Sequence, residues 1–255
     1  MDDRPGGPAP LAVTTRPGHG GRVVLVHGAM DRSRSFAKVV RRLDGCEVVT
    51  YDRRGYGDST DHGVCRTVAA HVDDLLTVLG ADAAVVVGHS LGGTIALAAA
   101  ERRPDLVRAV VAYEAPRPWV AWWPTDSAGS RATGVDDPAE AAERFMRRMV
   151  GDERWERLPR RTRDERRAEG EALVADLRSI RGEPAYHDDA VTVPVVAAHG
   201  SASGGHHVRT AEELAASVPH GELVVVEGAA HGVHLTHPDA LADLARRALD
   251  RSRAP

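Results

Sequence analysis

The sequence predicts an α/β fold in which helices flank a mostly parallel β-sheet. Segments rich in β-branched residues alternate along the chain with amphipathic segments of helical spacing, which is the order found in parallel sheets. The clearest unit is the strand-like run 85–87, which leads through Gly88-x-Ser90-x-Gly92 into a helix-forming segment, 94–101. The length of 255 residues fits one such domain with an insertion.

The composition argues against several other classes of protein. The net charge of -4 does not favour a general nucleic-acid binder, and a hydrophobic content of 42% is ordinary for a globular chain. Cys46 and Cys65 provide neither a disulfide framework nor a zinc spacing, so we expect reduced thiols. No apolar run approaches the roughly 20 residues that span a membrane. We therefore expect a cytoplasmic protein without a membrane partner.

The predicted elements follow in regular order up to residue 116 and again from residue 190. Residues 1–21 are rich in Pro and Gly, and we expect a flexible N-terminal segment there without a secretion signal. The predicted strands are 22–26, 47–51, 85–87, 107–113, 191–199 and 223–226. The predicted helices are 36–43, 68–79, 94–101, 210–217 and 239–249.

Residues 117–189 interrupt this order. Trp119, Trp122 and Trp123 stand among prolines there, and segments dense in charge follow them. Arginines alternate with acidic residues between positions 143 and 169, which is typical of a solvated helix face and does not favour a nucleic-acid patch. We predict a helical insertion into a single domain.

The segment around Ser90 is a candidate catalytic turn. A sharp strand-to-helix turn strains the backbone of its central residue, and the flanking Gly88, Gly92 and Gly93 lack the side chains that would obstruct it. Ser90 would then stand free at the end of the strand, above a helix N-terminus that favours negative charge. The alternative is an ordinary turn with a serine that caps the helix.

Four features together resemble the α/β-hydrolase superfamily, of the serine hydrolase type with a cap domain. They are His27-Gly28, the run Asp52-x-Arg54-Gly55-x-Gly57-x-Ser59, Gly88-His89-Ser90-Leu91-Gly92-Gly93, and Gly228-x-x-His231. The resemblance implies a mostly parallel eight-stranded sheet with a cap inserted after strand six. It assigns residues 22–116 and 190–255 to the core and 117–189 to the cap.

The resemblance implies Ser90 as nucleophile and His231 as the base that activates it. A serine at this position excludes the epoxide hydrolases and haloalkane dehalogenases of the family, which use an aspartate. His231, His234 and His237 also form a regular run, but Asp239 is the single carboxylate nearby, so we predict no metal site.

The third member of the triad is where this sequence departs from the commonest family pattern. The family usually places an aspartate three residues after a glycine at the end of strand seven, but this chain has Ser203 after Gly200. Glu114 follows strand six, where some family members carry the acid, so we predict Glu114 as the acid that orients His231. Glu227 is the alternative acid, and a dyad or a broken triad is also open.

The resemblance also implies an oxyanion hole formed by two backbone N–H groups, those of Ala29 and Leu91. Met30 would form an apolar wall beside them. Trp119, Trp122 and Trp123 could line a substrate pocket under the cap or pack within it.

These assignments predict a serine hydrolase that cleaves an ester, thioester or related small-molecule carbonyl substrate through an acyl-enzyme, without a cofactor. A carbon–carbon bond hydrolase or a perhydrolase could use the same site. The alternative from another class is a ligand-binding member of the superfamily without catalytic activity, which the missing aspartate favours.

Overall fold

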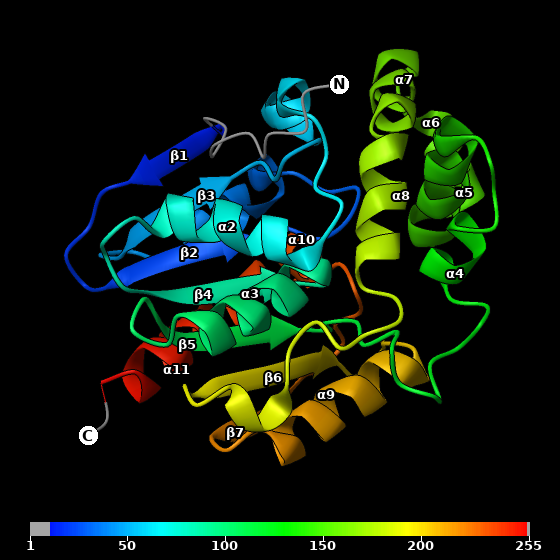
Figure 1. Ribbon diagram of the computed structural model, residues 1–255. Helices are drawn as coiled ribbons and strands as arrows, with labels where there is room; N and C mark the ends of the chain where they lie inside the picture. Colours follow the sequence, from blue (N-terminus) through cyan, green and yellow to red (C-terminus); the bar gives the residue numbers. More distant parts are fainter. Residues whose placement is uncertain (1–10, 254–255) are drawn as a thin grey trace, which may run out of the picture.

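A central sheet with helices on both faces organises residues 11–253, the part of the chain that the computed structural model describes (Figure 1). Its strands are β1 (Val13–Arg16), β2 (Arg22–Val26), β3 (Glu47–Tyr51), β4 (Ala84–His89), β5 (Val107–Tyr113), β6 (Val195–Gly200) and β7 (Gly221–Val226). Their spatial order is β1-β3-β2-β4-β5-β6-β7, in which β1 is antiparallel to β3 and the other pairs are parallel. The α/β class and the mostly parallel sheet are thus confirmed.

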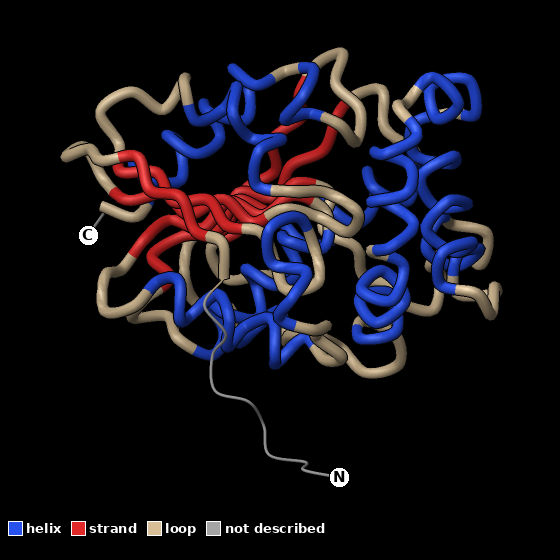
Figure 2. Tube along the Cα trace, turned by 90° about the horizontal axis from the view of Figure 1, so that it is seen from above, coloured by secondary structure: helices blue, strands red, loops and turns tan. Residues whose placement is uncertain are grey.

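The helical elements of the core are η1 (Ser33–Phe36), α1 (Ala37–Val40), η2 (Gly57–His62), α2 (Val68–Leu79), α3 (Leu91–Arg102), η3 (Asp188–Ala190), α9 (Gly205–Ser217), α10 (Val233–Thr236) and α11 (Pro238–Arg251). Alternate residues of the inner strands point to opposite faces, so Val24 and Val86 pack under α2 and α3, whereas Val23 and Val85 pack against α11. The result is three layers, with the sheet between two sets of helices (Figure 2).

Two predictions about the sheet are wrong in detail. The sheet has seven strands within the described residues, not eight, and the insertion follows β5, the fifth strand along the chain, not the sixth. Part of the expected flexible segment 1–21 is also a strand, because Val13–Arg16 pairs with β3 from Val13↔Tyr51 to Arg16↔Val48. Residues 1–10 lie outside the described part of the chain. The β-branched Val13, Thr14 and Thr15 explain why this edge forms.

Five α-helices lie between β5 and β6: α4 (Ala128–Ala132), α5 (Pro138–Val150), α6 (Asp152–Arg157), α7 (Arg160–Ala168) and α8 (Gly170–Ser179). They stand beyond the carboxyl ends of the central strands (Figure 1). We call residues 117–189 the insert and propose that it is a cap domain over the remaining core. None of the helices in the described part of the chain has both the length and the apolar character of a membrane span.

The strand order determines where a site can form. The chain leaves β2 for β3 on one side and then returns to β4 on the other side of β2. Loops that leave the carboxyl ends of β2 and β4 therefore diverge and open a crevice between them. The pair Val26↔Gly88 places the segment after β2 beside the Ser90 turn.

Candidate active site

Ser90 stands in the turn between β4 and α3 with a strained backbone, φ 53° and ψ -127°. The turn is tight: a Cβ on Gly88 would lie 2.3 Å from the carbonyl oxygen of Gly92, so a larger residue cannot occupy that position. The Ser90 N–H donates a hydrogen bond to the carbonyl of Tyr113, 2.8 Å away, which ties the turn to β5. The Ser90 side chain is half-buried and faces a cavity under the insert.

Glu114 follows β5 directly and is fully buried. Its Oε2 lies 2.7 Å from Nδ1 of His231, while its Oε1 accepts hydrogen bonds from the Gly200 N–H, at 3.1 Å, and from the Ser203 hydroxyl. Burial opposes ionisation of this carboxyl, but the contact with His231 outweighs it and lowers the pKa of Glu114 to about 2. An ionised Glu114 accepts a hydrogen bond from the Nδ1–H group and so leaves Nε2 of His231 unprotonated.

Ser90 and His231 line the same cavity, so the candidate nucleophile and the candidate base face one space. No hydrogen bond joins the Ser90 hydroxyl to the His231 ring within residues 11–253. Catalytic hydrogen bonds of this type are often long before a substrate binds, so the geometry is compatible with a Ser-His-Glu triad.

Ala29 and Leu91 border the same cavity as Ser90. Leu91 is the first residue of α3, where backbone N–H groups have no partner within the helix. The segment before Ala29 lies very close to the turn, since a Cβ on Gly28 would be 2.9 Å from Cβ of Ser90. Ala29 and Leu91 thus lie beside Ser90 along the cavity wall, and we propose their N–H groups as the oxyanion hole.

Backbone strain is concentrated at this site. Among the described residues, the three non-glycine residues with positive φ are Met30, at 55°, Ser90, at 53°, and Glu114, at 49°. Each follows the carboxyl end of a different central strand and stands next to or within the candidate machinery. Strain of this kind costs about 1–3 kcal/mol per residue and accumulates where function requires a fixed geometry.

The cavity encloses about 630 Å³ of space, part of it open to solvent. Its walls from the insert are mostly apolar and include Trp123, Phe145, Met149, Leu177 and Ile180. A mostly apolar space with a few polar groups at one end, next to a candidate nucleophile, is typical of a small-molecule site.

Of the four predicted pocket residues, Trp123 lines the cavity and the other three lie elsewhere. Met30 points into an apolar cluster with Tyr56 and Leu173, where it helps to pack the insert against the core. Trp119 packs edge-on against Tyr186, with ring centroids 5.5 Å apart.

Trp122 is held away from the cavity by polar partners on α9. Its Nε1 donates a hydrogen bond to Glu213, at 3.1 Å, and the Arg209 guanidinium lies 4.1 Å from its ring centroid. Sequence spacing could not separate these tryptophans, because their directions depend on a loop that follows no regular periodicity.

Two residues that the sequence analysis left without a role contact the candidate triad. Ser203 stands where the family pattern has its aspartate, and its hydroxyl now bonds Glu114. His207 stacks on His231 with ring centroids 4.7 Å apart, and its Nδ1 lies 3.8 Å from Oε2 of Glu114. Burial, followed by the nearby His231, lowers the pKa of His207 to about 3, so this ring is neutral. Because Ser203 replaces the aspartate of the family pattern Gly-x-x-Asp, that replacement was the signal that could have identified Ser203 as a neighbour of the acid.

Among residues 11–253, three groups of side chains bring potential metal ligands within 4.8 Å of one another: Glu114, His207 and His231; Asp31, His89 and His234; and Cys65, His71 and Asp74. The first group contains the Glu114–His231 hydrogen bond, which already accounts for its geometry. The prediction that the chain holds no metal stays a prediction.

Known proteins resemble this chain over most of its length. A family model described as "Alpha/beta hydrolase family" matches residues 23–244. A 2-(acetamidomethylene)succinate hydrolase of Mesorhizobium japonicum is 28% identical over 242 residues, covering 87% of this chain and 85% of that protein. A pimeloyl-[acyl-carrier protein] methyl ester esterase of Aromatoleum aromaticum is 31% identical over 252 residues, covering 87% of this chain and 95% of that protein. The crystal structure of an E-2-(acetamidomethylene)succinate hydrolase superposes with a TM-score of 0.66 at 26% identity, covering 94% of this chain and 95% of that chain.

Proposed function

Because the chain belongs to the alpha/beta hydrolase family, we propose that it is a serine hydrolase that cleaves an ester or related small-molecule carbonyl substrate. The observation that carries this proposal is the 2.7 Å contact between buried Glu114 and His231, beside a cavity that Ser90 also lines. An apolar cavity without this polar constellation would suit a binding protein equally well.

The reaction follows from the roles of these groups. Nε2 of His231 accepts the Ser90 proton while Oγ attacks the substrate carbonyl carbon, and Glu114 stabilises the resulting imidazolium. The N–H groups of Ala29 and Leu91 stabilise the negative charge on the carbonyl oxygen. His231 returns the proton to the leaving alcohol, an acyl-enzyme remains on Ser90, and a water activated by His231 releases the acid.

The relatives support hydrolysis as the reaction class and an ester as the bond. The relative from Aromatoleum aromaticum is named as a methyl ester esterase, and that from Mesorhizobium japonicum as a hydrolase of a substituted succinate. The apolar wall formed by Phe145, Met149 and Leu177 suits an acyl chain or another apolar group next to the cleaved bond.

Labelling by a fluorophosphonate probe tests the proposal. Such probes react with a serine that its neighbours have made nucleophilic, and peptide mass spectrometry identifies the modified residue. We expect modification of Ser90 in the wild type and none in Ser90→Ala, together with turnover of a nitrophenyl ester by the wild type. Folded wild-type protein that is neither labelled nor active, yet is stabilised by small ligands, would favour a binding protein.

A further inference from the structure

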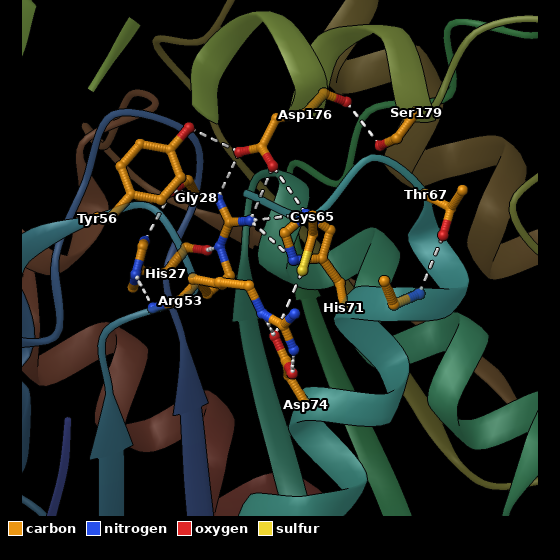
Figure 3. A network of polar contacts seen from close by, with 12 residues as sticks. His27, Gly28, Arg53, Tyr56, Cys65, Thr67, His71, Asp74, Asp176 and Ser179 are labelled. Carbon is orange, nitrogen blue, oxygen red and sulfur yellow. Dashed lines mark hydrogen bonds and ion pairs between the residues drawn. The ribbon is translucent and has the colours of Figure 1, made fainter. Parts of the chain in front are cut away.

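Arg53 lies behind the candidate oxyanion hole, in a polar network that Figure 3 shows from close by. It follows β3, and its side chain is 1% exposed. The guanidinium donates two hydrogen bonds to the backbone of the loop after β2: Nε to the carbonyl of His27, at 3.0 Å, and Nη2 to the carbonyl of Gly28, at 3.1 Å. Arg53 therefore contacts the loop that ends in Ala29.

The Gly28 carbonyl belongs to the same peptide unit as the Ala29 N–H. Because this peptide is planar and trans, its carbonyl and N–H point in opposite directions, and a group that holds one also aims the other. A second donor acts on the same oxygen: the backbone N–H of Arg53 bonds Nε2 of His27, at 2.9 Å, so the ring proton is on Nδ1, 2.8 Å from the Gly28 oxygen. Two donors thus fix and polarise this peptide.

A buried guanidinium needs a counter-charge, and the insert supplies it. Asp176 on α8 accepts from Arg53 through both carboxylate oxygens, at 2.7 and 3.2 Å. Tyr56 and His71 complete the site with hydrogen bonds to Asp176 of 2.7 and 2.8 Å. Burial opposes ionisation of Asp176, but Arg53 and His71 outweigh it and hold its pKa well below the ordinary value.

Asp176 directly precedes Leu177 on α8, and Leu177 lines the cavity. The backbone of α8 therefore connects the cavity wall to Asp176, and polar contacts lead from Asp176 through Arg53 to the Gly28–Ala29 peptide. The sequence separation of 123 residues between Arg53 and Asp176 shows that only the docked insert completes it.

We propose that Arg53 is a positioning residue of the oxyanion hole, which aims the Ala29 N–H at the substrate carbonyl, and that Asp176 makes this aim depend on the docked insert. The inference rests on the proposed function for its catalytic consequence. Its physical basis is that donors stabilise a developing oxyanion best when their direction is fixed before the reaction. A different role, in which the ion pair merely attaches the insert to the core, predicts loss of stability without a selective effect on the oxyanion.

The test compares Arg53→Lys with Tyr56→Phe. A lysine keeps the charge opposite Asp176 but lacks the planar fork that reaches two carbonyls and a carboxylate together. Tyr56→Phe removes a hydrogen bond to Asp176 from the same network and leaves the bonds to the loop intact. Both variants are expected to lower the melting temperature, which a purely structural role also predicts.

The catalytic readout separates the two roles. For Arg53→Lys we expect kcat for a nitrophenyl ester to fall about 10- to 100-fold with KM changed less than about threefold, somewhat below the cost of removing an oxyanion donor outright. Ser90 adds to the carbonyl of a trifluoromethyl ketone while His231 takes the serine proton, and the ketone oxygen becomes the oxyanion. The affinity of Arg53→Lys for such a ketone should fall by the same factor as kcat. Tyr56→Phe should stay within about threefold on both measures. Equal losses in the two variants would overturn the proposal.

A crystal structure of each variant gives a readout that does not depend on activity. In Arg53→Lys the Gly28–Ala29 peptide should rotate, and in Tyr56→Phe it should keep its orientation. If Arg53→Lys does not fold, Asp176→Asn, which removes the counter-charge at nearly constant size, is expected to give the same rotation. An unmoved peptide in these variants would contradict the inference, whereas wild-type protein without labelling or turnover would contradict the proposed function alone.

Discussion

Glu114→Gln replaces the candidate acid by a side chain of the same shape without charge. Oε1 of Glu114 accepts from the Gly200 N–H at 3.1 Å, and that donor requires an oxygen, so the glutamine must keep its oxygen there. Its NH₂ group then faces Nδ1 of His231, where the carboxylate oxygen stood at 2.7 Å. His231 must accept from the amide and carry its proton on Nε2, the tautomer that cannot take a proton from Ser90.

The expected loss follows from charge and tautomer together. A carboxylate about 4 Å from the centre of an imidazolium stabilises it by about 4 kcal/mol at an effective dielectric constant of about 20. At about 1.4 kcal/mol per factor of ten, this corresponds to roughly a 10³-fold loss in kcat/KM. The wrong tautomer adds to the loss, and the equivalent change in a serine protease lowers kcat by about 10⁴. We expect a decrease of about 10³- to 10⁴-fold.

The assay is kcat/KM for a nitrophenyl ester, with circular dichroism to verify folding. Glu227→Gln is the matched control, because Glu227 is exposed and should retain wild-type activity. Ser203→Ala removes one donor to Glu114 and should cost about tenfold or less. A folded Glu114→Gln variant that keeps more than a tenth of wild-type activity, or a Glu227→Gln variant with the larger loss, would refute the assignment of Glu114 as the acid.

Three further results are expected. Because the pKa of Glu114 falls from 4.5 to about 2 on folding, its ionisation stabilises the folded state above pH 4.5. About 3 kcal/mol of the free energy of unfolding should therefore be lost as the pH falls from about 4.5 to about 2. Urea unfolding of Glu114→Gln over this range should lack that loss, and the same dependence of unfolding free energy on pH in both proteins would count against the prediction. Ser203→Asp added to Glu114→Gln places a carboxylate where the Ser203 hydroxyl contacts residue 114, and its charge near the imidazolium should recover at least about tenfold in kcat/KM. No recovery in a folded double variant would argue against an effect of charge from this position. Phe145→Trp narrows the cavity and should lower kcat/KM for octanoyl esters more than for acetyl esters, whereas an equal effect on both would remove Phe145 from the acyl site.

Much of the fold could be predicted because it depends on local patterns. The predicted strands 22–26, 47–51 and 107–113 match β2, β3 and β5, and the predicted helix 68–79 matches α2. Buried parallel strands are continuous apolar runs, and amphipathic helices repeat at their own period, so neighbouring residues suffice to identify them. The edge strand β1 was missed because the Pro- and Gly-rich residues before it dominated the composition of residues 1–21.

The candidate site also has parts that the local sequence predicts and parts that it does not. The Ser90 turn is recognisable from adjacent glycines, and its place between a strand and a helix is encoded within about a dozen residues. The cavity wall cannot be recognised from neighbouring residues. Trp123 and Trp122 are adjacent in sequence, but Trp123 lines the cavity whereas Trp122 contacts α9. Side-chain direction in an irregular loop depends on the elements that pack against it.

The sequence by itself determined the class of the sheet, the strained serine turn and the order of serine, glutamate and histidine along the chain. The tertiary structure decided which carboxylate reaches His231, because Glu114 and His231 are 117 residues apart and meet only where β5 and the loop after β7 end at the same edge of the sheet. It likewise decided that Asp176 of the insert meets Arg53 behind the Gly28–Ala29 peptide. Contacts of this kind depend on how distant elements dock, which local periodicity and turn chemistry do not encode.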